Sequence, residues 1–242
     1  MRRSKDPWRR VVIPRSVREL VDKAKAALVA VPEPADTATY ADIYAYRVKL
    51  TRLQHNLMTE LDVLWRDELF DELVNIRPPF DEIYCIDMAQ RAVRYPYHEF
   101  AVLFNARDNA MNRRMNERSL TDADLPIQNT GSRKRYIVDV CPVDAYRTMG
   151  MSSCRYRTEH VDQTAADLVA VGLTSKRITV ETDFAGKYPG YGKGTWLVIS
   201  TAEPWSIDLA LRRSLLRRDN AMRAINPDWP ATRNKLWLPR RA

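Results

Sequence analysis

The sequence predicts an α+β protein that is predominantly helical. It is expected to form a long antiparallel helical hairpin followed by a small β-α-β-β-α layer, with extended basic N- and C-terminal arms. Three observations predict this fold: apolar residues recur at helical spacing between Thr39 and Ile76, β-branched and aromatic segments follow residue 134, and Arg and Lys gather at both ends. The predicted parts are a basic N-terminal arm (1–36), the long helical hairpin (37–120), a linker (121–134), a small α+β domain (135–226) and a Pro/Trp/Arg C-terminal tail (227–242).

The N-terminal arm begins without periodicity, since residues 1–16 contain Pro7-Trp8, Pro14 and five arginines. Ser16 is predicted to cap a short helix that ends near Val31. The apolar side of this helix would consist of Val17, Leu20, Val21 and Leu28. An Arg-rich start with a helical stretch is also typical of a mitochondrial import signal.

The longest predicted element is one amphipathic helix from Thr39 to Ile76. Its apolar residues follow one another at gaps of three or four: Ile43, Tyr46, Leu50, Leu53, Leu57, Leu61 and Leu64. Pro78-Pro79 ends the pattern, because proline lacks the amide donor and clashes with the preceding turn. A helix of this length would span roughly 57 Å, so we expect other elements to pack along it.

A second helical run returns after the two prolines, with apolar residues from Phe80 to Met115 and a predicted kink or break at Pro96. The tight turn favours an antiparallel hairpin. Its predicted interior pairs two groups of residues, namely Leu53, Leu57, Leu61 and Leu64 with Phe100, Leu103 or Phe104.

The pattern changes to strands beyond the linker. Predicted strands cover 136–143, 177–182 and 195–200, where β-branched and aromatic residues dominate. Thr158 is predicted to cap a helix through Val171, and Ser206 to cap another from Ile207 to Ile225. The inward residues of the last helix would be Leu211, Leu215, Met222 and Ile225. The tail from Asn226 is predicted to be extended.

The charge is distributed unevenly along the chain. Residues 1–32 carry a net charge of +6 and residues 210–242 a net charge of +7, whereas the middle carries −5 of the total of +8. Basic ends on a mildly acidic body are typical of arms that reach an acidic partner. Three widely spaced cysteines argue against a disulfide framework, and no apolar run is long enough for a transmembrane helix. The predicted location is mitochondrial, or otherwise cytoplasmic.

One loop contains four of the seven glycines, from Gly186 to Gly194. A phosphate-binding P-loop needs Gly-Lys followed directly by Ser or Thr and then a helix. Here Gly194 separates Lys193 from Thr195, and a strand is predicted to follow. The pattern favours a flexible hairpin loop. The alternative is an RNA contact made by Lys187, Tyr188, Tyr191 and Lys193.

Metal and catalytic motifs are weak in this sequence. Cys141, Cys154 and His160 lack the close ligand pairs typical of structural zinc. His98-Glu99 has no second histidine four residues later, and no serine is framed as a nucleophile elbow. We therefore predict no enzyme activity, and no catalytic residue, cofactor or metal.

The basic arms contain the best partner-binding pattern, because Trp and Arg are the residues most enriched at interface hot spots. The predicted contact residues are Trp8, Arg9, Arg10, Trp229, Arg233, Trp237, Arg240 and Arg241. Each tryptophan lies within two residues of a proline, which limits the entropy lost on docking. The alternative is that these tryptophans fold back onto the chain's own surface.

These patterns favour a non-catalytic structural or accessory subunit of a large multi-subunit assembly. A mitochondrial energy-transducing complex, either the respiratory chain or ATP synthase, is the first hypothesis, with other protein subunits as partners. An RNA-binding protein of the ribosomal or mitoribosomal type is the second, because arms rich in Arg neutralise phosphates. A viral or phage structural protein is the third. Contact with the surface of a membrane is compatible with the basic arms.

Overall fold

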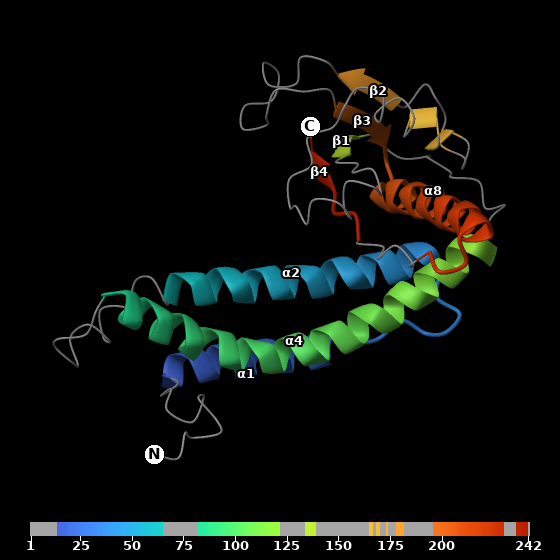
Figure 1. Cartoon of the computed structure of the whole chain (residues 1–242). Coiled ribbons are helices and arrows are strands. Elements are labelled where there is room, and N and C mark those ends of the chain that lie inside the picture. The colour runs from blue at the N-terminus through green and yellow to red at the C-terminus, as the bar shows by residue number, and fades with distance from the viewer. Residues whose placement is uncertain are drawn as a thin grey trace. The chain divides into compact units, whose positions relative to one another are not determined.

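The structure is a computed structural model that describes residues 14–64, 82–121, 134–138, 178–181, 196–229 and 236–241, with positions 165, 166, 168, 169 and 173. Its described helices are α1 (Arg15–Ala30), α2 (Tyr40–Leu64), α4 (Glu82–Thr121) and α8 (Pro204–Ile225). Together with a small antiparallel sheet, they confirm an α+β fold that is predominantly helical (Figure 1). None of these helices is long and apolar enough to cross a membrane.

The chain divides into two compact units, which are described separately. The helical unit consists of Met1–Thr37 and Tyr46–Met111, and the sheet unit consists of Ala38–Ala45 and Asn112–Ala242. The division therefore falls within α2 and within α4, so each unit contains one part of both helices.

Side-chain bonds define the directions of the helices in the helical unit. Gln54 of α2 donates to Tyr97 of α4 at 3.0 Å, and Arg47 of α2 donates to Asp108 of α4 at 2.8 Å. A residue further along α2 therefore contacts a residue earlier on α4. The two helices are thus antiparallel, whereas α1 runs in the same direction as α4 (Figure 1). The predicted turn at Pro78-Pro79, and the helix predicted from residue 65 to 76, lie outside the described residues.

The predicted apolar stripe of α2 is buried at Leu57 and Leu61 and partly buried at Leu53 and Leu64. On α4, Phe100 and Phe104 are buried, and their rings stack with centroids 6.2 Å apart. The prediction for Leu103 is wrong, since its side chain is 40% exposed. Residues 100 and 104 share one helical face, and residue 103 lies to the side of it.

Pro96 does not break the second helix, contrary to that part of the prediction, because α4 continues through it. Val93 and Phe100 are buried on either side of the proline, and Pro96 itself is buried. The packing of residues on both sides of Pro96 offsets the free-energy cost of the backbone hydrogen bond that proline cannot donate.

Two of the predicted helix starts are wrong. Pro14 occupies the N-cap of α1, so Ser16 lies inside the helix. Glu203 occupies the N-cap of α8, followed by Pro204, and the Ser206 hydroxyl instead donates to the Glu203 carbonyl at 2.7 Å. Pro204 suits the first helical position of α8 because its missing N–H has no partner there, and this preference outweighs the cap that Ser206 offers.

The start of α2 agrees with the prediction to within one residue. The Thr39 hydroxyl accepts the Asp42 N–H at 3.2 Å, and the Asp42 carboxylate accepts the Thr39 N–H at 3.0 Å. This reciprocal pair satisfies two backbone donors that a helix start would otherwise leave open. The Thr39 hydroxyl also donates to the Asp42 carboxylate at 2.6 Å. This bond is the largest cause of the lowered pKa of Asp42, followed by the bond from the Thr39 N–H.

Among its described residues, the sheet unit has four antiparallel strands in the order β2-β3-β1-β4. They are β1 (Lys134–Val138), β2 (Ile178–Glu181), β3 (Trp196–Thr201) and β4 (Arg240–Arg241). The first three overlap the predicted strands. The fourth was not predicted, because the sequence placed it in an extended tail.

A hydrophobic core lies between the sheet and the helices of this unit. Its buried members are Tyr136, Leu168, Leu173, Leu197, Ile199, Ile207 and Ala210, and Leu211 and Trp237 pack against them. The described residues between Ala165 and Val169 are helical, in agreement with the helix predicted from Thr158, whose other residues lie outside the described ones. The inward prediction for Ile225 is wrong: it is the last residue of α8 and is 81% exposed.

Candidate functional site

Buried charges on α8 form the most unusual feature of the sheet unit. Asp208 and Arg212 stand one helical turn apart, and each is only 2% exposed. Burying an ion removes its hydration, so each of its hydrogen-bonding atoms needs a partner within the protein. We use the name α8 polar network for Tyr40, Asn112, Asn116, Asp208 and Arg212.

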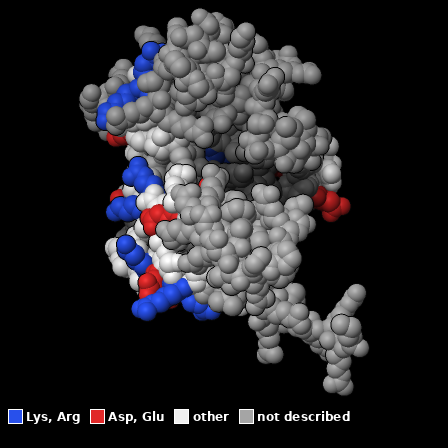
Figure 2. Space-filling view, turned by 90° about the vertical axis from the view of Figure 1, so that its left-hand side faces the viewer, with Lys and Arg blue, Asp and Glu red and all other residues white. Residues whose placement is uncertain are grey.

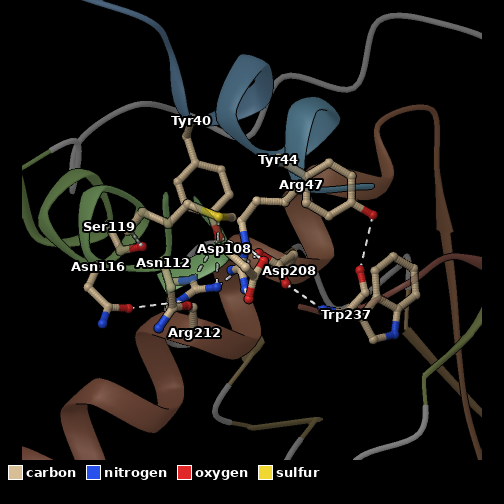
Figure 3. Close-up of polar contacts among 11 residues, drawn as sticks. Tyr40, Tyr44, Arg47, Asp108, Asn112, Asn116, Ser119, Asp208, Arg212 and Trp237 are labelled. Atoms are coloured by element: carbon tan, nitrogen blue, oxygen red, sulfur yellow. Dashed lines mark hydrogen bonds and ion pairs between the residues drawn. The ribbon is translucent and has the colours of Figure 1, made fainter. Parts of the chain in front are cut away.

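Arg212 distributes its donors over two helices that are distant in sequence (Figure 3). One terminal nitrogen donates to the side-chain oxygens of Asn112 at 2.9 Å and Asn116 at 2.7 Å, both on α4. Its Nε donates to the hydroxyl of Tyr40, at the start of α2, at 3.1 Å. Asn112 and Asn116 are four residues apart, which places both on one face of α4. The guanidinium therefore joins α8 to the parts of α2 and α4 that belong to the sheet unit.

Asp208 completes the network from the opposite side. Its Oδ2 accepts the Tyr40 hydroxyl at 2.5 Å, and its Oδ1 accepts the backbone N–H of Trp237 at 2.8 Å. The nearest Arg212 nitrogen lies 3.7 Å from Oδ2, so the two ions attract each other without a direct short hydrogen bond. The carboxylate thus has a donor on each oxygen.

Burial raises the pKa of Tyr40 well above its ordinary value, and the Asp208 charge raises it further, while the Arg212 charge opposes the shift. Both main causes disfavour the phenolate in this dry, negatively charged surrounding. Tyr40 therefore remains neutral at physiological pH. It both donates to Asp208 and accepts from Arg212, which links the two ions through a neutral group.

The C-terminal segment is attached to this network. The Tyr44 hydroxyl donates to the Trp237 carbonyl at 3.1 Å, so side chains of α2 and α8 bind both backbone groups of one residue. The Trp237 ring meets Tyr136 edge to face, with centroids 6.1 Å apart. Arg240 and Arg241 then pair with Ile137 and Tyr136 as β4. The tail is therefore an integral part of the sheet unit.

The helical unit has an ion pair of its own, between the buried Arg47 and the partly exposed Asp108, which is also drawn in Figure 3. Arg47 is buried and donates to both oxygens of Asp108, from Nε at 2.8 Å and from a terminal nitrogen at 2.9 Å. A two-point pairing of this kind fixes orientation as well as charge. It joins α2 to α4 and uses both carboxylate oxygens of Asp108.

The described residues contain no cluster of three or more His, Cys, Asp or Glu side chains that could hold a metal ion. Cys141, Cys154 and His160 lie outside them. His55 and His98 are exposed on the surfaces of α2 and α4. The most deeply buried charged groups among the described residues, Arg47, Asp208 and Arg212, are each bonded to other groups of the chain.

Eight of the twelve predicted partner-binding and RNA-contact residues lie outside the described residues. These eight are Trp8, Arg9, Arg10, Arg233, Lys187, Tyr188, Tyr191 and Lys193. Trp229 is partly buried in the turn after α8, where its backbone N–H donates to the Asn226 carbonyl at 2.9 Å. Trp237 folds back onto the chain's own core, which is the alternative that the sequence left open.

The sequence analysis did not identify the α8 polar network. The spacing of Asp208 and Arg212 is a visible signal, because an acidic and a basic residue four positions apart form a pair on a helix. Such pairs are usually exposed, however, and Tyr40 and Asn112 lie 168 and 100 residues away from their partners. Only the tertiary fold brings these residues together. Comparison of the chain with protein-family models, curated proteins and solved structures finds no match.

Proposed function

We propose that this chain is a non-catalytic structural subunit of a large multi-subunit assembly, held in place by other protein subunits. The assembly we propose is a mitochondrial energy-transducing complex of the respiratory-chain or ATP-synthase type. The mitochondrial part of the proposal comes from the Arg-rich N-terminal sequence and the basic balance of the chain. The fold that goes with it is a closed helical hairpin, a β-α-β-β-α layer and an extended basic N-terminal arm. The described end of the C-terminal tail belongs to the sheet unit as β4.

The observation that carries the non-catalytic part is the internal use of the buried charges. Catalytic acids and bases need a position that a reactant can reach. In the α8 polar network, each oxygen of Asp208 accepts a donor from the chain, and Arg212 donates to groups of α2 and α4. This arrangement supports the role of a rigid connector between helices.

The distribution of charge supports binding to an acidic partner through the sheet unit. That unit has 22 basic and 15 acidic residues, a net charge of +7, whereas the helical unit has 17 and 16, a net charge of +1. Lys134 and Arg135 are exposed on β1. On the face drawn in Figure 2, basic and acidic side chains are interspersed over the described residues.

The same charge favours a second candidate function, RNA binding of the ribosomal type. A surface that neutralises phosphates releases counterions, so its affinity falls steeply as salt rises. Protein docking through apolar and Trp-containing contacts depends much less on salt.

Deletion of residues 1–13 tests the proposal. If the N-terminal arm docks into other subunits, the shortened chain should lose its place in the assembly and retain the helical content of the full chain. Deletion of 227–242 is a poorer test, because Trp237 and β4 belong to the sheet unit. A shortened chain that still co-sediments with the assembly as well as the full chain would refute docking through this arm.

A further inference from the structure

The seam between α1 and α4 carries an exposed apolar surface. Val29 of α1 is 62% exposed and Val102 of α4 is 54% exposed. Other apolar residues are exposed beside them: Ala26 and Ala30 of α1, and Tyr95, Leu103 and Ala106 of α4. We call these seven residues the α1–α4 apolar face. It belongs entirely to the helical unit.

Two contacts fix the position of this face. Lys25 of α1 binds Glu99 of α4 at 3.0 Å. Because α1 and α4 run in the same direction, Val29 and Leu103, each four residues further on, occupy the next turn along the same seam. Tyr95, Val102 and Ala106 are spaced by seven and four residues, so they share one face of α4.

Arg107 of α4 fixes the C-terminal end of α1 at the seam. Its guanidinium binds the carbonyl of Leu28 and forms an ion pair with Glu33 at 3.3 Å. A cation at the C-terminal end of a helix satisfies open carbonyls and complements the helix dipole. The end of α1 is therefore held on α4 directly beside the exposed apolar residues.

The charges around the face are unbalanced. Its acidic residues are paired within the chain, since Glu19 binds Arg15 at 2.6 Å, and Asp22 and Glu99 share Lys25. These acceptors raise the pKa of Lys25, with the hydrogen bond to Glu99 as the largest cause. Lys23 and Arg94, by contrast, are exposed and have no acidic partner among the described residues. Four basic residues (Arg15, Lys23, Lys25 and Arg94) therefore stand against three acidic ones (Glu19, Asp22 and Glu99) at the border, a net charge of +1.

We propose that the α1–α4 apolar face docks an amphipathic helix of a partner protein that carries acidic residues along the borders of its apolar stripe. Helix-in-groove recognition of this kind uses apolar anchors at spacings of three, four and seven residues. The alanines of the face allow close approach, and Val29, Tyr95, Val102 and Leu103 supply the apolar area. The acidic borders of the partner would lie over Lys23 and Arg94.

A second copy of this chain fits the face less well. A symmetric dimer brings the same surface of both copies together. Each copy would then place its own basic border against the basic border of the other, and like charges at an interface are unfavourable. An acidic partner helix has the complementary charge. This inference rests on the proposed function, because it names the kind of partner that a structural subunit would bind.

The test uses the full chain and two fluorescently labelled helical peptides of about 20 residues, or roughly 30 Å. Both carry the same apolar stripe, bordered by Glu in one and by Lys in the other. We expect the Glu peptide to bind about tenfold more tightly than the Lys peptide in fluorescence anisotropy, since only the former complements Lys23 and Arg94. Val102→Asp should abolish this binding, and Arg94→Glu should reduce the preference for the Glu peptide.

Val63→Asp on α2 is the matched control, because Val63 is an exposed valine outside the face. It should bind the Glu peptide as the unchanged chain does. Equal binding of both peptides, or an equal loss in Val63→Asp, would overturn the proposal. A dimer in sedimentation velocity that Val102→Asp dissociates would overturn it in favour of a second copy. Absence of peptide binding by a chain that still co-sediments with an assembly would refute this face and leave the proposed function standing. Peptide binding by a chain that sediments alone would support this face and refute the proposed function.

Discussion

Replacement of Arg212 by Met tests whether the α8 polar network holds the sheet unit together. Met has a similar length and fills the same space without charge or donors. The substitution removes the bonds to Asn112, Asn116 and Tyr40 in one step. It also leaves Asp208 as a buried charge without a neighbouring cation.

The expected cost follows from these contacts. Removing one partner of a buried ion pair usually costs about 3–5 kcal/mol, because the remaining charge stays buried. Asp208 still accepts from Tyr40 and Trp237 after the change, so we expect the lower end of that range, about 3 kcal/mol. Arg212→Lys should cost less, because lysine retains the charge and loses the planar set of donors.

Urea unfolding followed by far-ultraviolet circular dichroism measures this loss of unfolding free energy. Hydrogen exchange of the α8 amides shows whether the loss is local to the sheet unit. Arg217→Met is the matched control, since Arg217 is an exposed residue on the same helix, and it should cost at most about 1 kcal/mol. If Arg212→Met and Arg217→Met had the same effect, the network would not be what holds α8 in place.

Four further changes test individual contacts. Leu57→Ala should cost about 2–5 kcal/mol in urea unfolding because Leu57 is fully buried, whereas Leu103→Ala should cost far less at its exposed position. Because the pKa of Tyr40 is raised, the unfolded tyrosine ionises first, so Tyr40 should lower the free energy of unfolding above pH 10 by about 1.4 kcal/mol per pH unit. In alkaline denaturation, Tyr40→Phe should remove this contribution and leave that of Tyr46, whose pKa is also raised by burial. The pKa of Asp42 is lowered, so the ionised carboxylate should stabilise the fold above its ordinary pKa of 3.8, and this stabilisation should disappear as the pH falls through the lowered value. Thermal melts of Asp42→Asn should therefore show a lower melting temperature than the unchanged chain at pH 7 and no difference at pH 2. Trp237→Ala should cost about 2–3 kcal/mol, below the usual range for a fully buried tryptophan, and should speed exchange of the β1 amides; an unchanged rate would mean that the tail does not support the sheet.

The sequence predicted the elements better than their contacts, for reasons that can be traced to particular residues. The periodicity that predicted α2 is local, and Leu57 and Leu61 are buried as it requires. The three main strands also follow from local composition. Proline was the main source of error, because Pro96 lies inside α4 and Pro204 rather than Ser206 starts α8.

Long-range contacts account for the features that the sequence did not predict. Local pattern reading treats Asp208 and Arg212 as an ordinary exposed pair, and nothing in the sequence indicates that Tyr40 comes from the opposite end of the chain to accept and donate between them. The tail was predicted to reach a partner because it contains Trp and Arg. Trp237 instead packs at the edge of the chain's own core. Tyr136 provides an aromatic contact for its ring, and Asp208 accepts a hydrogen bond from its backbone N–H.

The central claim is that this chain is a subunit of a large protein assembly. The most direct measurement is sedimentation of the native chain from its source, before and after nuclease treatment, in 0.5 M salt, where the screening length is about 4 Å. The account predicts that the chain sediments with a large complex under both conditions. Sedimentation as a free chain of 28.1 kDa without nuclease would contradict it, and release by nuclease alone would show that RNA is the partner.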